Sequence, residues 1–166
     1  GSSMNFEILQ TDSLSISMGG TSSKKITFPN IPLYDKNGKP NINNNTTYVA
    51  HTGKTLNVVD AYKEKGFDFS GTISMDKKTG YHSKSILNVP LKNHENDTIG
   101  VIQLLNSINK ETGEIQPFDS EMQELVESLA SQGAVALTNK NLIKDLKNLF
   151  ESFIKLIAIA IDKKSP

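Results

Sequence analysis

The chain has 166 residues, of which 18 are basic and 18 acidic, so its formal net charge is zero. A chain of this length can form one domain with a buried core plus an appendage. Because a neutral protein has no broad electrostatic attraction for phosphate backbones or anionic membranes, nucleic acid is a poor candidate partner. The sequence contains no cysteine, which excludes disulfides and thiol nucleophiles and argues against a structural zinc site.

The sequence gives no sign of a membrane span or of secretion. No apolar run approaches the ~18–20 residues that are needed to cross a bilayer, and no signal peptide is recognisable at the start. We therefore expect a cytoplasmic protein. Residues 1–3 (Gly-Ser-Ser) have the composition of an expression scar, so we set them apart from the fold.

The first third of the chain predicts short strands separated by polar turns. The runs Phe6–Gln10 and Leu14–Met18 flank a Thr-Asp-Ser turn and alternate apolar with polar residues, which predicts a β-hairpin. Lys25–Leu33 is a third strand candidate, but its two prolines confine it to a sheet edge or to an irregular segment. The Asn-rich stretch Asp35–Thr47 is predicted to be a loop.

A short helix is predicted next, because Thr46 or Thr47 can cap its first turn. The helix runs through Thr52, and Gly53 can end it. A short strand is predicted immediately afterwards, at Leu56–Val58.

The middle of the chain mixes an irregular segment with two clearer strands. Asp60–Lys78 has a few apolar residues among polar ones and is too irregular to be assigned to a strand. Ser83–Leu91 alternates and predicts a strand that Pro90 ends. Asn93–Asp97 is predicted to be a hairpin turn, and the most apolar segment, Thr98–Ile108, is predicted to be the central strand.

From Asp119 the apolar period changes from two to about 3.5 residues, which predicts a long helix over Ser120–Asp162. The sequence Ser-Glu-Met-Gln at its start is that of a capping box. At ~1.5 Å per residue this helix would be roughly 65 Å long, more than one domain can bury. Its seam positions, alternately four and three residues apart over about five heptads, are Leu125, Leu129, Gln132, Ala136, Asn139, Ile143, Leu146, Phe150, Phe153, Ile157 and Ala160.

Two interpretations of this helix remain open. In one, its first half packs on the sheet and its second half is a frayed tail. In the other, two copies of the chain form a parallel homodimeric coiled coil, in which the polar seam residues Gln132 and Asn139 fix the register. The second interpretation predicts a homodimer through Ser120–Asp162 and a signal that passes along the helix.

Three phrases in the middle of the chain carry a resemblance to a known family: Val49–Tyr62 (VAHTGKTLNVVDAY), Thr79–Leu91 (TGYHSKSILNVPL) and Gly100–Asn106 (GVIQLLN). In this order and spacing the chain resembles a GAF domain, the small-molecule sensor module of cyclic-nucleotide phosphodiesterases and of many bacterial signalling proteins. The resemblance covers roughly Phe6–Leu137. It implies an α+β, PAS-like α/β/α sandwich with a central antiparallel sheet and a long C-terminal helix. Residues 4–137 would form this domain, with the usual N-terminal helix truncated.

The end of the chain carries a second, shorter resemblance. Leu149–Pro166 (LFESFIKLIAIAIDKKSP) is similar to the first helix of an HD-GYP-type metal-dependent phosphohydrolase domain, which follows GAF domains in that family. The resemblance implies that residues 138–166 form a signalling helix that leads to a downstream domain of this kind, a cyclic di-GMP phosphodiesterase. The chain is therefore interpreted as a piece of a longer bacterial signalling protein.

The GAF resemblance also implies a ligand pocket between the sheet and its covering helices. The contacting positions of cyclic-nucleotide GAF domains carry over to seven residues of this chain: Asn45, Thr46, Phe69, Asp76, Thr79, Ser83 and Gln103. Such a set can bind a planar heterocycle, because an aromatic ring can stack on it while an amide and hydroxyls bond to its edge. The alternative is that Phe69 belongs to the core and that the hydroxyls cap strand ends.

Two departures from the family weigh against a cyclic nucleotide. Nucleotide-binding phosphodiesterase GAF domains carry an Asn-Lys…Phe…Asp-Glu signature, but here Ser107 replaces the lysine of its structural ion pair and Ser120 replaces the glutamate. The chain also contains no arginine, which excludes bidentate phosphate recognition. The ligand therefore stays unknown, either a cyclic nucleotide or another small molecule, and a covalently attached bilin is excluded by the absence of cysteine.

The chain on its own is predicted not to be an enzyme. None of its three histidines is followed by the aspartate that an HD-type metal site requires, and it contains no nucleophile elbow, P-loop or dinucleotide fingerprint. The favoured function is a regulatory sensor that controls a downstream HD-type phosphohydrolase. The rivals are a ligand-free dimerisation module, a haem or iron gas sensor that uses His51 or His82, and a cryptic hydrolase that uses the same histidines.

Overall fold

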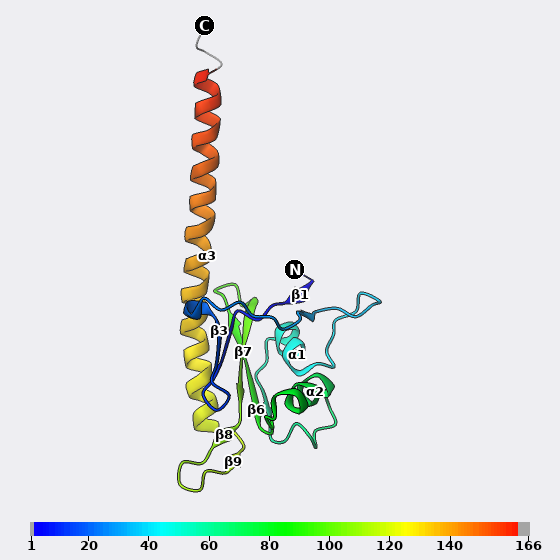
Figure 1. The fold of residues 1–166 in the computed structure, drawn as a ribbon. Coiled ribbons are helices and arrows are strands. Elements are labelled where there is room, and N and C mark those ends of the chain that lie inside the picture. The colour runs from blue at the N-terminus through cyan, green and yellow to red at the C-terminus, as the bar shows by residue number, and fades with distance from the viewer. Residues whose placement is uncertain (1, 163–166) are drawn as a thin grey trace.

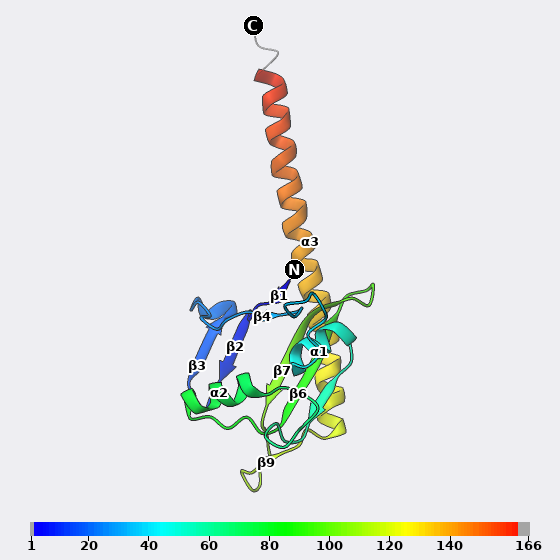
Figure 2. The ribbon, with the colours of Figure 1, turned by 90° about the vertical axis from the view of Figure 1, so that its right-hand side faces the viewer.

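The computed structural model describes residues 2–162 of the chain. Its body is an α+β unit, and the helix α3 (Ser120–Asp162) runs along one face of the body and then continues well beyond it (Figure 1). The short helices α1 (Asn45–Thr52) and α2 (Ser70–Thr79) lie on the opposite side of the sheet from α3 (Figures 1 and 2). The predicted α/β/α sandwich with an antiparallel sheet and a long C-terminal helix is therefore confirmed.

The sheet between these layers has three antiparallel strands, β5 (Leu56–Val58), β6 (Ile86–Lys92) and β7 (Thr98–Leu105), in the order β5-β6-β7. β6 is thus the central strand, and the prediction that Thr98–Ile108 would be central is wrong. β6 has neighbours on both edges and helices over both faces, so its residues 86–89 are buried. β7 lies at the edge of this sheet, and its side chains are partly or largely exposed.

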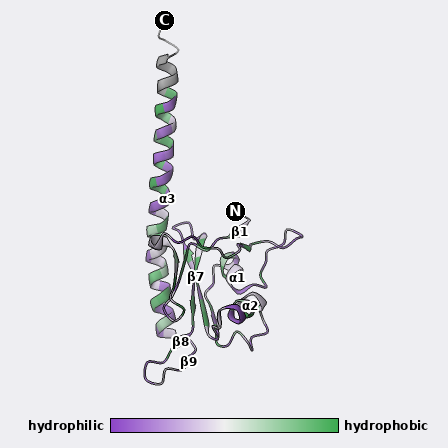
Figure 3. Cartoon of the chain, viewed as in Figure 1, coloured by the Kyte–Doolittle hydropathy of each residue, from purple (hydrophilic) through white to green (hydrophobic). Residues whose placement is uncertain are grey.

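The face of β6 that is turned towards α3 is apolar. Leu87 and Val89 pack there with Phe118, Val126 and Ala130. Burial of this cluster holds the first turns of α3 against the sheet, because removing apolar surface from water stabilises the packed arrangement. Figure 3 shows the strands as the most continuously apolar part of the body.

The opposite face of β6 combines a second core with a polar residue. Ile86 packs there with Val58, Ala61 and Phe69, beneath the helices α1 and α2. Since successive side chains of a strand point to opposite faces, Asn88 lies on the same face as Ile86. Asn88 is fully buried, so this face places an amide where most strands would place an aliphatic side chain.

Pro90 does not end its strand, contrary to the prediction, but pairs with Val101 of β7. β5 accompanies β6 only as far as Asn88, so the proline lies where β6 has one neighbour and the absence of an N–H is tolerated. The turn that follows is as predicted: the Asn93 N–H donates to the Asp97 carbonyl oxygen at 3.0 Å.

The N-terminal segments form two small sheets of their own. The predicted hairpin is present as β2 (Ile8–Thr11) and β3 (Ile16–Gly19), followed by a single 3-10 turn over Gly20–Ser22. Of the third candidate, Lys25–Leu33, only β4 (Ile31–Pro32) is a strand, and it pairs with β1 (Ser3–Met4). Part of the segment 1–3 that the sequence analysis sets apart from the fold therefore takes part in a backbone pairing.

Two further short strands precede the long helix. β8 (Ser107–Ile108) and β9 (Ile115–Gln116) form an antiparallel hairpin whose turn contains a glycine at a φ of 73°. The next residues lead directly into α3.

The helix caps are one residue or more away from their predicted positions. The side chain of Asn44, not that of Thr46 or Thr47, caps α1, since its Oδ1 accepts from both threonine N–H groups. At the start of α3 the Asp119 carboxylate accepts from the Met122 N–H at 2.8 Å, so the predicted capping box is not the one used. The side chain that reaches the free N–H groups thus stands two residues before the first predicted cap in α1 and one residue before it in α3.

α2 is the element that the sequence analysis missed. The prediction treats Asp60–Lys78 as irregular, whereas Ser70–Thr79 is helical and ends at Gly80, which has a φ of 72°. The buried residue of this helix is Asp76. Because its inward position is occupied by a charged side chain, the helix lacks the apolar periodicity by which amphipathic helices are recognised.

α3 carries two different apolar rows beside the body. Val126, Ala130 and Ala134 are buried against the sheet. The seam residues Leu125 and Leu129 lie on another side of the helix and are each 54% exposed. The first half of α3 therefore packs on the sheet, as one interpretation predicts, and still leaves its seam row uncovered, as the other requires.

Beyond the body, α3 runs alone without a break (Figure 1). Residues 139–156 are all exposed, and their large apolar side chains form what we call the distal stripe: Leu142, Ile143, Leu146, Leu149, Phe150, Phe153, Ile154 and Leu156, each 50–68% exposed. The side chains of the last seam positions, Ile157 and Ala160, and the residues 163–166 lie outside the described part of the chain. None of the described helices is both long and apolar enough to cross a membrane.

Candidate functional site

The structure divides the predicted site residues into two polar groups and two structural residues. One group surrounds the Asp76 carboxylate at the end of α2. The other joins α1 to the sheet through Asn45, Thr46 and Gln103. Phe69 and Thr79 belong to neither group.

Asp76 is the centre of the first group. Although it is only 4% exposed, its carboxylate accepts three hydrogen bonds: from the Ser83 N–H at 2.7 Å, from the Ser83 hydroxyl at 2.8 Å and from the Tyr62 hydroxyl at 2.8 Å. A buried carboxylate needs such donors to offset its loss of hydration. Asp76 lies in the segment that the sequence predicts to be irregular, but the helix α2 carries it inwards against the segment that enters β6.

Tyr62 and His82 close the outer side of this group. Their rings are tilted against each other with centroids 4.4 Å apart. The hydrogen bond to Asp76 raises the pKa of the Tyr62 hydroxyl, and partial desolvation and the carboxylate charge act in the same direction. The sequence analysis did not place Tyr62 or His82 next to Asp76, because no local pattern shows that residues 62, 76 and 82 meet.

The second group is a chain of hydrogen bonds across the face of the sheet that is covered by α1. Gln103 of β7 donates from Nε2 to the Thr46 hydroxyl at 3.1 Å and to Asn88 Oδ1 at 2.8 Å. The Thr46 hydroxyl in turn donates to Asn45 Oδ1 at 3.2 Å. Asn88 and Gln103 are direct cross-strand partners, which explains why their side chains meet.

Two amide nitrogens of this group find no hydrogen-bond partner in the part of the chain that the structure describes. Asn45 Nδ2 and Asn88 Nδ2 are buried and make no hydrogen bond with the described residues. Buried polar atoms are paired in most proteins, so an unpaired pair of donors in one small group calls for an explanation such as a ligand or an ordered water. Gln103, by contrast, is exposed at the edge of the group.

Asn88 is the residue of this group that the sequence analysis missed. Its signal is a single polar residue inside the otherwise apolar run Ile86–Leu91. A polar side chain at an inward position of a central strand is uncommon, because its burial costs free energy unless a partner is present.

The remaining two predicted site residues have structural environments. Phe69 is 5% exposed and belongs to the core with Val58 and Ile86. The Thr79 hydroxyl donates to the Met75 carbonyl oxygen at 3.0 Å, one turn back along α2. Phe69 is thus a core residue, as the alternative interpretation has it, whereas the Thr79 hydroxyl bonds within the last turn of the helix α2 and not at the strand end that this interpretation expects.

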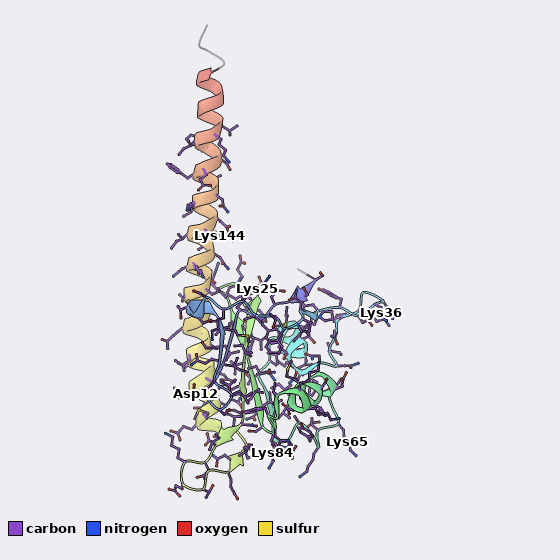
Figure 4. All side chains as sticks on the ribbon, viewed as in Figure 1. Asp12, Lys25, Lys36, Lys65, Lys84 and Lys144 are labelled. Atoms are coloured by element: carbon purple, nitrogen blue, oxygen red, sulfur yellow. The ribbon has the colours of Figure 1, made fainter. Side chains whose placement is uncertain are left out.

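The histidines occupy separate places. His51 Nε2 lies 2.6 Å from the Leu33 carbonyl oxygen and so donates to it, which ties α1 to the N-terminal segment. His82 stacks on Tyr62, and His94 lies in the turn between β6 and β7. Among the described residues, no three or more His, Cys, Asp or Glu side chains gather closely enough to hold a metal ion. The charged side chains labelled in Figure 4 are spread over the body and α3.

Comparison with known protein families identifies the family of this chain. The GAF domain family matches residues 6–137. The chain belongs to the GAF domain family. The match has the bounds that the resemblance in the sequence predicts. A GAF domain is a regulatory, non-catalytic module, which agrees with the prediction that this domain is not itself an enzyme.

Similar curated proteins include phosphodiesterases. The dual 3',5'-cyclic-AMP and -GMP phosphodiesterase 11A of Takifugu rubripes is 29% identical over 115 residues, which are 69% of this chain and 12% of that protein. The dual 3',5'-cyclic-AMP and -GMP phosphodiesterase 11 of Drosophila melanogaster is 38% identical over 64 residues, 39% of this chain and 4% of that protein. The cGMP-specific 3',5'-cyclic phosphodiesterase of the same organism is 41% identical over 61 residues, 37% of this chain and 5% of that protein. The chain thus spans a small part of each relative.

Proposed function

We propose that this GAF domain is a small-molecule sensor, and that its ligand binds beside α1 on the face of the sheet that carries Asn88 and Gln103. The observation that carries the proposal is the hydrogen-bonded group of Asn45, Thr46, Asn88 and Gln103, with its two unpaired amide nitrogens. A binding site needs a few convergent polar groups on an apolar floor, and Ile86 and Val58 supply that floor next to Asn88.

The first ligand class to test is a 3',5'-cyclic nucleotide. The relatives named above act on cyclic AMP or cyclic GMP, and a purine offers a flat ring with hydrogen-bonding atoms along its edge. The absence of arginine means that the phosphate would have to be held by neutral groups or lysine. Of the predicted site residues, we retain Asn45, Thr46 and Gln103 as ligand contacts, and treat Asp76 and Ser83 as the support that holds α2.

The output of the sensor is proposed to be α3. Its seam row is exposed beside the body and its distal stripe is exposed beyond it. We propose that a second copy of the chain covers both, so that α3 forms a parallel homodimer. A ligand would then bias two arrangements of the paired helices, which requires that it bind them with unequal affinity.

The regulated domain is proposed to be a metal-dependent phosphohydrolase that continues from α3. The relatives support a phosphodiesterase in general. We also propose the finer prediction, that the regulated domain is an HD-GYP-type cyclic di-GMP phosphodiesterase of a bacterial signalling protein. This part of the proposal rests on the resemblance of residues 149–166 alone. The relatives given above come from a fish and a fly.

Two measurements test the proposal. The first is native mass spectrometry of protein purified without added ligand, and the second is titration of that protein with cyclic GMP and cyclic AMP. We expect a dimer that either retains a small molecule or binds one of the two nucleotides. A dimer that binds neither would favour the rival interpretation, a ligand-free dimerisation module. An absorbance spectrum of the fresh protein tests the haem alternative, for which a Soret band is the required result.

A further inference from the structure

The hydrogen-bond directions in the Asn45–Gln103 group are fixed by a backbone donor. The Thr46 N–H, which can only donate, lies 2.8 Å from Asn45 Oδ1, so this atom of Asn45 is the amide oxygen. The Thr46 hydroxyl gives its single hydrogen to the same oxygen at 3.2 Å. Towards Gln103 the Thr46 hydroxyl is therefore an acceptor.

The orientation of the Gln103 amide follows from this. The atom of Gln103 that lies 3.1 Å from the Thr46 hydroxyl is the donor Nε2, and its second hydrogen goes to Asn88 Oδ1 at 2.8 Å. An amide nitrogen has two hydrogens, and both are now used within the protein. The free atom of the Gln103 amide is Oε1, on an exposed side chain.

We infer that Asn88 is a positioning residue that, together with the Thr46 hydroxyl, takes up both hydrogens of Gln103 Nε2 and so turns Gln103 into a pure hydrogen-bond acceptor, and that the site therefore selects ligands whose ring edge carries N–H donors. The inference rests on the proposed function and concerns the same site. Asn88 is suited to this role because it is fully buried in the central strand and directly opposite Gln103.

The site would distinguish two purine rings by the hydrogen-bonding groups along their edges. The guanine edge presents two adjacent donors, N1–H and the 2-amino group, to an acceptor such as Oε1. An unsubstituted purine edge presents only ring nitrogens, which are acceptors, and would leave Oε1 facing a lone pair. A site built to bond to a particular polar group rejects the analogue that lacks it, because the protein group is then left unpaired.

Binding of two probes to four proteins tests this inference. The probes are cyclic GMP and purine riboside 3',5'-cyclic monophosphate, which share ring and phosphate but differ at the edge. The proteins are the wild type, Asn88→Leu, Gln103→Glu and the double variant, and isothermal titration calorimetry gives the ratio of the two Kd values. Leucine has the same branching and the same number of side-chain heavy atoms as asparagine, but it is larger and offers Gln103 no acceptor.

We expect the wild type to prefer cyclic GMP by about tenfold or more, the effect of one well-made hydrogen bond. In Asn88→Leu the Gln103 amide can turn over, so the ratio should fall to about threefold or less. Both oxygens of a carboxylate accept hydrogen bonds, so the orientation of the side chain no longer matters in Gln103→Glu. The preference for cyclic GMP should therefore persist in Gln103→Glu and in the double variant. A purely structural role for Asn88 would lower both affinities without changing their ratio.

Two results separate failure of this inference from failure of the proposed function. Wild-type protein that binds both probes equally, or an Asn88→Leu variant that keeps the full preference, leaves the site in place and overturns the inference. Wild-type protein that binds neither probe overturns the proposed cyclic-nucleotide site and this inference with it. If Asn88→Leu does not fold, Thr46→Val removes the other acceptor of Gln103 Nε2 from a half-buried position, and the same fall in the ratio is expected.

Discussion

At the scale of single residues, Asp76 shows how a charged side chain can hold two elements together. Its carboxylate joins α2 to the start of β6 through the Ser83 N–H and hydroxyl, and to the preceding loop through Tyr62. Without the carboxylate, the buried Ser83 N–H and hydroxyl would be left without an acceptor. The loss of a buried acceptor therefore costs more than one hydrogen bond is worth.

The first prediction concerns this carboxylate. We expect Asp76→Ala to lower the free energy of unfolding by about 2–4 kcal/mol, because the buried Ser83 N–H and hydroxyl lose their acceptor. Asp68→Ala is the control, since the Asp68 carboxylate accepts from the Ser70 N–H at an exposed site, where water can replace it. Urea unfolding followed by circular dichroism measures both. An effect of Asp76→Ala no larger than that of the control would show that the carboxylate does not hold α2.

The second prediction concerns the Tyr62 hydroxyl, whose pKa is raised by its hydrogen bond to Asp76. Folding favours the protonated phenol, so this contribution to stability is complete below the usual tyrosine pKa of about 10 and is lost as the pH rises through the folded pKa. Absorbance titration at alkaline pH should show one late phenol that Tyr62→Phe removes. In Asp76→Asn that phenol should ionise at lower pH, and a late phenol that persists in Tyr62→Phe would contradict the assignment.

At the scale of elements, the helix ends decide where the site residues lie. Asn44 Oδ1 accepts from the Thr46 and Thr47 N–H groups at 3.0 and 3.1 Å and so fixes the first turn of α1. That turn carries Asn45 and Thr46, the two contacts that α1 gives to the site. A cap is thus a requirement of the site as well as of the helix.

The third prediction follows from this cap. Asn44→Ala should lower the free energy of unfolding by about 0.5–2 kcal/mol, the usual cost of losing an N-cap side chain. Asn43→Ala, one residue earlier, is the control, because Asn43 contributes its backbone carbonyl, which accepts from the Asp68 N–H, and that contact survives the substitution. Chemical denaturation of the two variants compares them. Equal stabilities would mean that Asn44 does not act as the cap.

The elements also show how far the sequence could be interpreted. The strand β6 and the long helix α3 were predictable, because their apolar residues recur at a period of two or about 3.5. The strand β7 was predictable because its segment is the most apolar in the chain, and the helix α1 because residues that can cap and end a helix flank it. α2 was not, since Asp76 occupies its inward position. The caps were misplaced because several capping residues stand side by side before each helix, and only the backbone geometry selects Asn44 and Asp119.

The candidate site was predictable in part for a related reason. The family resemblance names Thr46 and Gln103, and the structure brings them within hydrogen-bonding distance. The resemblance does not name Asn88. The residue that lies opposite Asn88, and the face of the sheet that the two share, depend on the register of β6 with β7. Register is a property of two strands, and neither strand's sequence contains it alone.

At the scale of the whole molecule, the distribution of apolar surface is uneven. The body buries its cores on both faces of the sheet, whereas the distal stripe of α3 is exposed along its whole length. Exposed apolar surface of this extent marks an interaction site. The occupant proposed above is a second copy of α3, because two helices with seam spacings of alternately four and three residues can bury the same row of each other.

The fourth prediction tests this pairing. Replacing Leu146 and Phe150 by glutamate places like charges in the seam. These two side chains are 64% and 65% exposed in the single chain but would be buried in the proposed dimer. Because an unpaired buried charge is strongly unfavourable, we expect light scattering to show a dimer for the wild type and the 18.2 kDa monomer for the variant. The control introduces the same two charges at Asn141 and Asn148, which are exposed and lie off the seam, and should remain dimeric. A wild-type monomer, or a dimer that survives the seam charges, would show that α3 does not join two copies and that the distal stripe is covered by something else.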